Sequence, residues 1–255
     1  MSRPFLLMTT FSVLSFSLSL LYALQPDPNI KPMQVLLIGN SQCPTIIANQ
    51  LIENLAKSDS KEGSRSIKIV GCIKGGASLK SHWDAGLSPM SARSMIASGT
   101  YNFIVLQDIY NVEEPAFAPY ARLFCALIKE KSATPILFST ASIISDYPRG
   151  FERLHRIQLA LGKELGVPVV DSSYAYLKYL GEKPSTERLE SLFAKDKAHL
   201  GLWGSYIYSC GIYSAITNRN PINLAAPHSI PVDVVKQLQE AAWLQHQETK
   251  SAMNK

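Results

Sequence analysis

The sequence lacks any dense run of charge of one sign. Charged residues make up 18% of the 255 residues, and the formal net charge is only +5. The most basic stretch, residues 57–68, also contains Asp59 and Glu62. This mixture is typical of a solvated loop rather than a phosphate-binding surface, so nucleic acid is not an expected partner.

Beyond residue 25 the sequence has no apolar run of about 18 residues, so no later segment is expected to span a membrane. Residues 1–25 differ: Arg3 precedes apolar residues mixed with Ser and Thr, and Pro26 and Pro28 follow them. This pattern predicts a secretory signal peptide and a secreted or periplasmic protein. Cleavage after Ala23 would leave Leu21 where a small residue is preferred. An uncleaved N-terminal anchor is therefore the alternative, and only in that case is a membrane a partner.

No C-x-x-C pair occurs among the four cysteines, so neither a redox motif nor a cysteine zinc site is indicated. Three of the four lie in apolar segments, where a free cysteine behaves as a small core residue. Export would permit a disulfide, but the spacing indicates no specific pairing. We favour buried thiols for the set, which is Cys43, Cys72, Cys125 and Cys210.

Several familiar catalytic and binding motifs are also missing. There is no P-loop, no G-x-G-x-x-G after the first expected strand and no H-E-x-x-H. The G-x-S-x-G elbow of α/β-hydrolases is broken, because Cys43 occupies its last position. Any serine chemistry must therefore use another arrangement.

What is present is a hydrophobic fraction of 46%, enough for one α/β domain with a sizeable core over residues 26–255. Short runs rich in β-branched residues are typical of buried parallel strands. They occur at 34–38, 67–70, 103–106, 135–138 and 167–170. Amphipathic stretches lie between or after them, at 46–55, 120–128, 154–165, 201–217 and 231–247. The alternation predicts a three-layer α/β/α sandwich around a flavodoxin-like parallel sheet of about five strands.

In such a sheet, ligands bind at the carboxyl ends of the strands, where the strand order reverses between the first and third strands. Ser41 follows the first strand and Gln107 ends the third. The N–H groups of the next helix would stabilise an oxyanion formed at Ser41. Helix capping is the simpler role for a serine at this position when it is considered alone.

A serine nucleophile needs a base and a group that orients the base. Asp196 and His199 have a spacing that lets a carboxylate reach an imidazole within one turn, and no other histidine has an aspartate three residues before it. The segment precedes an expected helix start, so Asp196 could instead be a helix cap.

Together these residues resemble the SGNH (GDSL-like) hydrolases. Gly39-Asn40-Ser41 resembles the nucleophile block, and Gly75-Gly76 the second block, whose glycine N–H lines the oxyanion hole. Gln107 lies where the third block usually has asparagine, and the segment 196–199 resembles the D-x-x-H block. The closest likeness is to an uncharacterised bacterial branch reading GNS, GG-x-x-L-x-x-H-W, LQ and D-x-x-H.

The resemblance implies a serine esterase with no metal and no cofactor. Ser41 would attack the ester, His199 would act as base, and Asp196 would orient His199. The N–H groups of Ser41 and Gly76 and the side chain of Gln107 would hold the oxyanion. The breadth of the family makes small-molecule or carbohydrate esters plausible substrates, including O-acetylated sugars. An acyltransferase using the same triad and a non-catalytic binding module are the alternatives.

Two features of the blocks have competing interpretations. Gln107 would either donate to the oxyanion or satisfy backbone groups of its own loop. His82 and Trp83, which end the second block, would either shape a substrate pocket or form a packing patch near the crevice.

Overall fold

The computed structural model describes residues 31–111 and 113–254. The leader expected at residues 1–25 lies outside this part of the chain. A single five-stranded parallel sheet runs through the described residues in the order β2-β1-β3-β4-β5. Its strands are β1 (Met33–Gly39), β2 (Ile67–Ile73), β3 (Phe103–Gln107), β4 (Thr134–Ser139) and β5 (Val169–Asp171).

This order is the flavodoxin-like arrangement, so the fold predicted from the strand–helix alternation is confirmed. Each expected strand is present. The fifth begins later than predicted, because Pro168 precedes it and only Val169–Asp171 pairs with β4.

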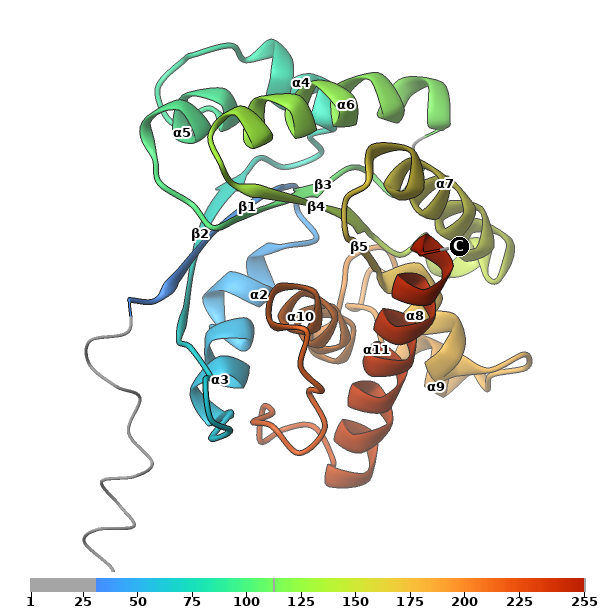
Figure 1. Ribbon diagram of the computed structural model, residues 1–255. Coiled ribbons are helices and arrows are strands. Elements are labelled where there is room, and N and C mark those ends of the chain that lie inside the picture. The colour runs from blue at the N-terminus through green and yellow to red at the C-terminus, as the bar shows by residue number, and fades with distance from the viewer. Residues whose placement is uncertain (1–30, 112, 255) are drawn as a thin grey trace, which may run out of the picture.

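Helices cover both faces of the sheet, as Figure 1 shows, with α4, α5 and α6 above it and α2, α3, α10 and α11 below it. The helices of the described chain are α2 (Pro44–Ala48), α3 (Leu51–Ser58), α4 (Leu79–Asp84), α5 (Ala92–Ser98), α6 (Glu114–Glu130), α7 (Arg149–Leu165), α8 (Ser172–Leu180), α9 (Thr186–Glu190), α10 (Leu202–Thr217) and α11 (Val232–Met253), with a short 3-10 turn η1 (Ile144–Asp146).

The strand β1 shows why the sheet needs two helical layers. Leu36 and Ile38 belong to the apolar cluster on one face, whereas Val35 and Leu37 belong to the cluster on the other. All four side chains are buried. Because both faces of the strand are apolar, each must be covered by helices to remove it from water.

One expected helix is in fact two. The stretch predicted as a single helix over 46–55 is divided into α2 and α3, because Gln50 adopts a left-handed conformation with φ 48°. Asn49 ends α2 and donates from Nδ2 to the carbonyl of Thr45 at 2.9 Å. The apolar periodicity continues across the break, so the pattern alone did not reveal it.

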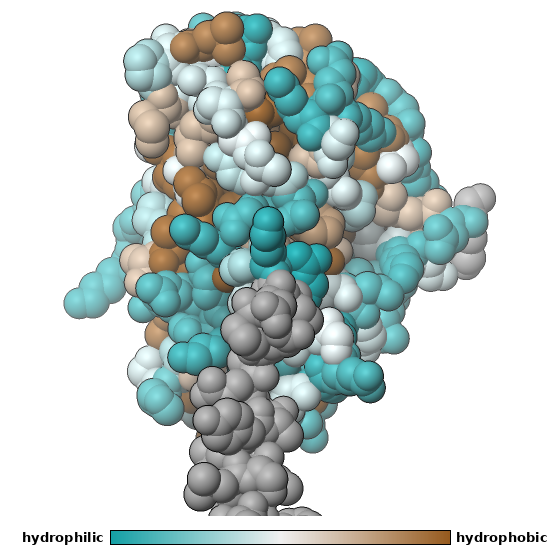
Figure 2. Space-filling view, turned by 60° about the vertical axis from the view of Figure 1, so that its left-hand side comes forward, coloured by the Kyte–Doolittle hydropathy of each residue, from teal (hydrophilic) through white to brown (hydrophobic). Residues whose placement is uncertain are grey.

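The helix α10 is buried on nearly all sides. A Cβ atom on Gly204 would lie 2.2 Å from the Tyr176 hydroxyl and 2.3 Å from the Leu192 carbonyl, so close packing requires glycine there. No helix within the described residues is both long and apolar enough to cross a membrane. Figure 2 shows one face of the molecule as a mosaic of hydrophilic and hydrophobic residues.

Candidate active site

Ser41 lies directly beyond the carboxyl end of β1, next to the point where β1 and β3 are neighbours. Its side chain is exposed. It does not cap a helix, because the residue at the N-cap of α2 is Cys43 and that helix has no side-chain cap. The capping interpretation is therefore wrong.

Ser41, His199 and Asp196 form a hydrogen-bonded chain. The Oγ of Ser41 lies 2.9 Å from Nε2 of His199, and Nδ1 of His199 lies 2.7 Å from Oδ2 of Asp196. With the proton on Nδ1, the imidazole donates to the carboxylate, and Nε2 is free to accept from the serine hydroxyl. This is the connectivity that a serine nucleophile, a base and its orienting group require.

The turn that carries Asp196 and His199 is held by hydrogen bonds from its own backbone N–H groups. The Oδ1 atom of Asp196 accepts the N–H groups of Ala198 at 3.0 Å and His199 at 2.9 Å. These N–H groups and the imidazole lower the pKa of the Asp196 carboxyl to about 2, with the His199 N–H contributing most. Asp196 is therefore a carboxylate at neutral pH. It does not cap α10, whose N-cap is Gly201.

Gln42 joins the turn that carries Ser41 to the turn that carries Asp196 and His199. Its Nε2 donates to the carbonyl of Ala198 at 3.0 Å, and its Oε1 accepts the N–H of Leu200 at 2.9 Å. The two bonded residues flank His199 on both sides. The buried Gln42 amide thus fixes the backbone of the base relative to that of the nucleophile.

Asn40 is the centre of a second, buried network. Its side chain donates to the carbonyls of Ala77 at 3.1 Å and Asp108 at 3.4 Å, and accepts from Gln107 Nε2 at 3.0 Å. The backbone N–H of Asn40 in turn donates to Gln107 Oε1 at 2.8 Å. Asn40 therefore connects the ends of β1 and β3 to the loop after β2.

The amide of Gln107 faces Asn40, and the side chain is completely buried. A Cβ atom on Gly39 would lie 2.3 Å from Gln107 Oε1, so glycine at the end of β1 is what admits this amide. The geometry therefore favours a role in holding Asn40 over direct donation to an oxyanion. The partner differs from the neighbouring loop groups that the sequence suggested.

The structure also brings the second block to this edge of the sheet. Gly76 adopts a positive φ of 63° in the turn closed by the Ala77 N–H and the Lys74 carbonyl, a conformation that favours glycine. Ala77 O then accepts from Asn40. Among the hydrogen bonds of the described residues, none uses the N–H of Ser41 or of Gly76, which leaves both donors for a ligand.

His82 and Trp83 have separate roles. The Nε2–H of buried His82 donates to the carbonyl of Gly39 at 2.9 Å, which attaches α4 to the strand end just before the nucleophile. Burial lowers the pKa of His82, which keeps the imidazole neutral. Trp83 packs edge-on against Phe124 at 5.1 Å, with the Arg93 guanidinium over its ring. For Trp83 the packing interpretation is confirmed.

Two other ionisable groups at this edge of the sheet are buried. Cys43 donates from Sγ to Gln107 Oε1 at 3.2 Å, and burial raises the pKa of its thiol to about 12. It is therefore a thiol and a poor nucleophile. Burial also raises the pKa of the Asp108 carboxyl to about 6, and its Oδ2 has no hydrogen-bond partner. All four cysteines are buried free thiols, as favoured from the sequence.

The sequence does not indicate the bonding roles of Asn40 and Gln42. Asn40 is only the middle residue of the nucleophile block, and no motif includes Gln42. Nowhere in the described part of the chain do three His, Cys, Asp or Glu side chains come together so as to hold a metal ion.

No protein-family model matches the chain, and no curated protein matches it either. Solved structures do match. A DUF4886 family protein from Bacteroides uniformis aligns with a TM-score of 0.62 and 17% identity, over 84% of this chain and 94% of that one. A variant of Axe2, an acetyl-xylooligosaccharide esterase from Geobacillus, aligns with a TM-score of 0.57 and 11% identity, over 76% and 97%. TesA aligns with a TM-score of 0.51 and 13% identity, over 73% and 99%.

At these identities the likeness establishes the fold alone, because one fold supports many activities. The chain has the α/β fold of these proteins, of which the Geobacillus enzyme is described as an esterase.

Proposed function

We propose that this protein is an SGNH-type serine esterase that hydrolyses carboxylic esters through an acyl-enzyme on Ser41. The observation that carries the proposal is the continuous chain from Ser41 Oγ through His199 to the Asp196 carboxylate. Its support from other proteins is indirect: two structures of the Geobacillus enzyme are described as catalytic mutants, one with a serine and one with a histidine replaced by alanine.

In the first half of the reaction, Ser41 Oγ attacks the acyl carbon while its proton passes to His199 Nε2. The tetrahedral oxyanion would accept the N–H groups of Ser41 and Gly76. His199 then gives the proton to the leaving alcohol as the acyl–oxygen bond breaks. Asp196 stabilises the imidazolium and remains ionised throughout.

In the second half, water attacks the acyl-enzyme. His199 takes a proton from the water and returns it to Ser41 Oγ, which releases the carboxylic acid. If a sugar hydroxyl replaced this water, the same acyl-enzyme would make the protein an acyltransferase. Asn40, Gln42 and Gln107 act in both halves by holding the reacting groups in place.

For the substrate we propose an O-acetylated carbohydrate. The side chains of His199 and Asp196 are 47% and 52% exposed, so the reacting groups lie at the surface. A shallow, open site admits a bulky polymer that an enclosed pocket would exclude. A fold neighbour is named as an acetyl-xylooligosaccharide esterase, which points in the same direction.

The proposal is tested with the purified full chain and p-nitrophenyl acetate. We expect hydrolysis, labelling by a fluorophosphonate probe, and loss of both in Ser41→Ala. The exposed residue Ser251 on α11 offers a matched control, and Ser251→Ala should be unaffected. Combining Ser41→Ala with His199→Ala should add little to either single loss, because triad members act as a unit. A protein with neither labelling nor ester hydrolysis would be a binding module.

We also propose that the protein is exported, because an apolar leader precedes Pro26. The leader lies outside the described residues, so the test is chemical. Mass spectrometry of the native protein should find a mature chain starting near residue 24 or 26. An intact N-terminus would favour the anchor instead.

A further inference from the structure

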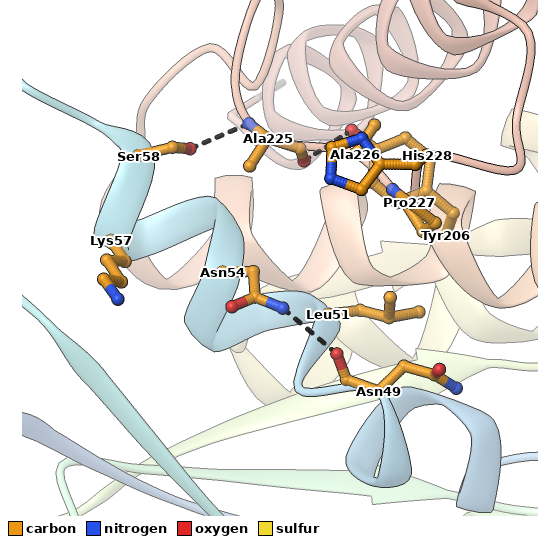
Figure 3. A pocket seen from close by; sticks show the side chains of 10 residues that line it. All are labelled: Asn49, Leu51, Asn54, Lys57, Ser58, Tyr206, Ala225, Ala226, Pro227 and His228. Atoms are coloured by element: carbon orange, nitrogen blue, oxygen red, sulfur yellow. Dashed lines mark hydrogen bonds between the residues drawn. The ribbon is translucent and has the colours of Figure 1, made fainter.

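A groove of about 720 Å³ lies between α3 and the loop that follows α10. One wall is formed by Asn49, Leu51, Asn54 and Lys57, and the other by residues 225–228. Figure 3 shows the residues of the two walls, those of α3 below and those of the loop above. We call it the α3 groove. It does not include Ser41, His199 or Asp196.

The loop wall of the α3 groove is preformed. The N–H of Ala225 donates to Ser58 Oγ at 2.8 Å, and the Ala225 carbonyl accepts from the Tyr206 hydroxyl at 3.0 Å. Buried Gln239 donates to that same hydroxyl at 2.7 Å and to the Leu224 carbonyl at 3.0 Å. Ser58, Tyr206 and Gln239 all belong to helices, so the loop that they bind keeps its shape without a ligand. A preformed wall lowers the entropy cost of binding.

The other wall offers oriented polar groups. Nδ2 of Asn49 donates to the Thr45 carbonyl at 2.9 Å, and Nδ2 of Asn54 donates to the Asn49 carbonyl at 3.1 Å. These bonds fix both amides and use one donor of each. The two Oδ1 atoms accept no hydrogen bond from any described residue, so they remain for hydroxyl donors. Lys57 adds an exposed cationic donor beside them.

The composition of the lining limits the class of ligand. No aspartate or glutamate lines the groove, so it does not fit a cation. Ala226 and Pro227 supply apolar surface, and the amides and Lys57 supply donors and acceptors. A ligand with apolar CH faces and many hydroxyl groups satisfies both sets at once. A sugar chain, neutral or carrying carboxylate groups, has this chemistry.

The α3 groove also lies within reach of Ser41. Asn49 ends α2, the five-residue helix that begins at Pro44, so the chain from Ser41 to Asn49 spans at most roughly 20 Å. On the other side, α10 begins just after His199, and Tyr206 lies in its second turn, about 6 Å along the axis. The elements that carry the nucleophile and the base therefore continue into the groove.

We propose that the α3 groove binds sugar units of the oligosaccharide whose ester is held at Ser41. This inference rests on the proposed esterase function and extends it. The groove would anchor the chain at a distance from the ester, so it should affect the KM of long substrates and leave the chemical step unchanged.

Binding is measured by calorimetry on the full chain carrying Ser41→Ala, with unacetylated xylohexaose as the probe. We expect binding that weakens about fivefold for each lost hydrogen-bonding group in Asn54→Ala and Lys57→Ala. Ala226→Trp, which fills the groove, should weaken it further. Lys61→Ala is the matched control, because Lys61 is exposed near the end of α3 but does not line the groove.

Kinetics with Ser41 intact complete the test. Asn54→Ala should raise the KM for acetylated xylo-oligosaccharides about fivefold at unchanged kcat, with p-nitrophenyl acetate hydrolysis unaltered. An enzyme that hydrolyses the aryl ester but does not bind xylohexaose, or binds it equally well in all variants, overturns the proposed sugar binding in the groove. That result leaves the proposed esterase function standing. Sugar binding in the groove without any ester hydrolysis overturns the esterase instead.

Discussion

The Oε1 atom of Gln42 accepts the backbone N–H of Leu200 at 2.9 Å, across 158 residues of sequence. Together with the bond from Gln42 Nε2 to Ala198 O, this contact fixes the turn that carries His199. The nucleophile and the base are 158 residues apart in the sequence, and one buried amide next to Ser41 sets their separation.

Gln42→Ala should therefore damage catalysis without touching the triad. It removes both bonds, so the His199 turn is free to shift, and a displacement of about 1 Å can cost about 10²-fold in rate. We expect kcat to fall by roughly 10–10² and unfolding free energy to fall by about 1–3 kcal/mol. Gln247→Ala, at an exposed position on α11, is the control. An unchanged kcat would show that the two Gln42 hydrogen bonds are not needed for catalysis.

Asp196→Asn tests the orienting role of the carboxylate. Asparagine keeps the oxygen that accepts the Ala198 and His199 N–H groups, but its NH₂ cannot accept the proton of Nδ1. The imidazole would change tautomer and no longer accept from Ser41, so we expect kcat to fall by about 10⁴ with little change in melting temperature. Asp196→Ala should lower the melting temperature as well, because it also loses the turn. Normal turnover in Asp196→Asn would exclude the proposed role.

Gln107→Ala separates two functions of a buried amide. A direct oxyanion donor would cost roughly 10²–10³ in kcat with no loss of stability. The observed bonds to Asn40 instead predict a loss of about 1–3 kcal/mol in unfolding free energy, together with a lower kcat because Asn40 moves. Thermal unfolding and kinetics on the same preparation decide between them. A large fall in kcat at an unchanged melting temperature would support the direct donor.

His82 should act through its Nε2–H bond to the Gly39 carbonyl. His82→Gln places an amide N–H near the same position, whereas His82→Asn is too short and His82→Leu has no donor. We expect Gln to retain most of the kcat, and Asn and Leu to lose stability by about 1–3 kcal/mol, the cost of an unsatisfied buried group. Equal behaviour of the three variants would mean that only packing matters at this site.

Asp108 predicts a dependence of stability on pH. Burial raises the pKa of its carboxyl from 3.8 to about 6, so the folded state binds the proton more tightly than the unfolded state. Stability contributed by the neutral form is present below pH 4 and is lost as pH rises through 6, up to about 3 kcal/mol.

Asp108→Asn removes this titration. It should be more stable than the wild type at pH 7, and the difference in melting temperature should shrink toward pH 4. Exposed Asp233→Asn is the control. A difference that does not vary with pH would contradict the assignment of the shift to Asp108.

The strands and their order followed from the sequence because their cause is local. A short run such as 103–106 must be buried on both faces, and parallel strands separated by helices leave few arrangements. Ser41 and Gln107 could also be placed near one edge from topology, and the D-x-x-H spacing and the family resemblance added Asp196 and His199 to them. The break at Gln50 was not predictable, because a left-handed residue does not interrupt the apolar periodicity on either side.

The sequence by itself determined the layered α/β fold and the identity of the residues that could form a triad. Both the hydrophobic periodicity and the D-x-x-H spacing are relations between residues that lie close together along the chain. Only the tertiary structure decided how those residues are held. Gln42 meets Leu200 across 158 positions and Asn40 meets Gln107 across 67. A buried amide bonds to whichever polar group the packing brings within about 3 Å, and no spacing along the chain encodes that partner.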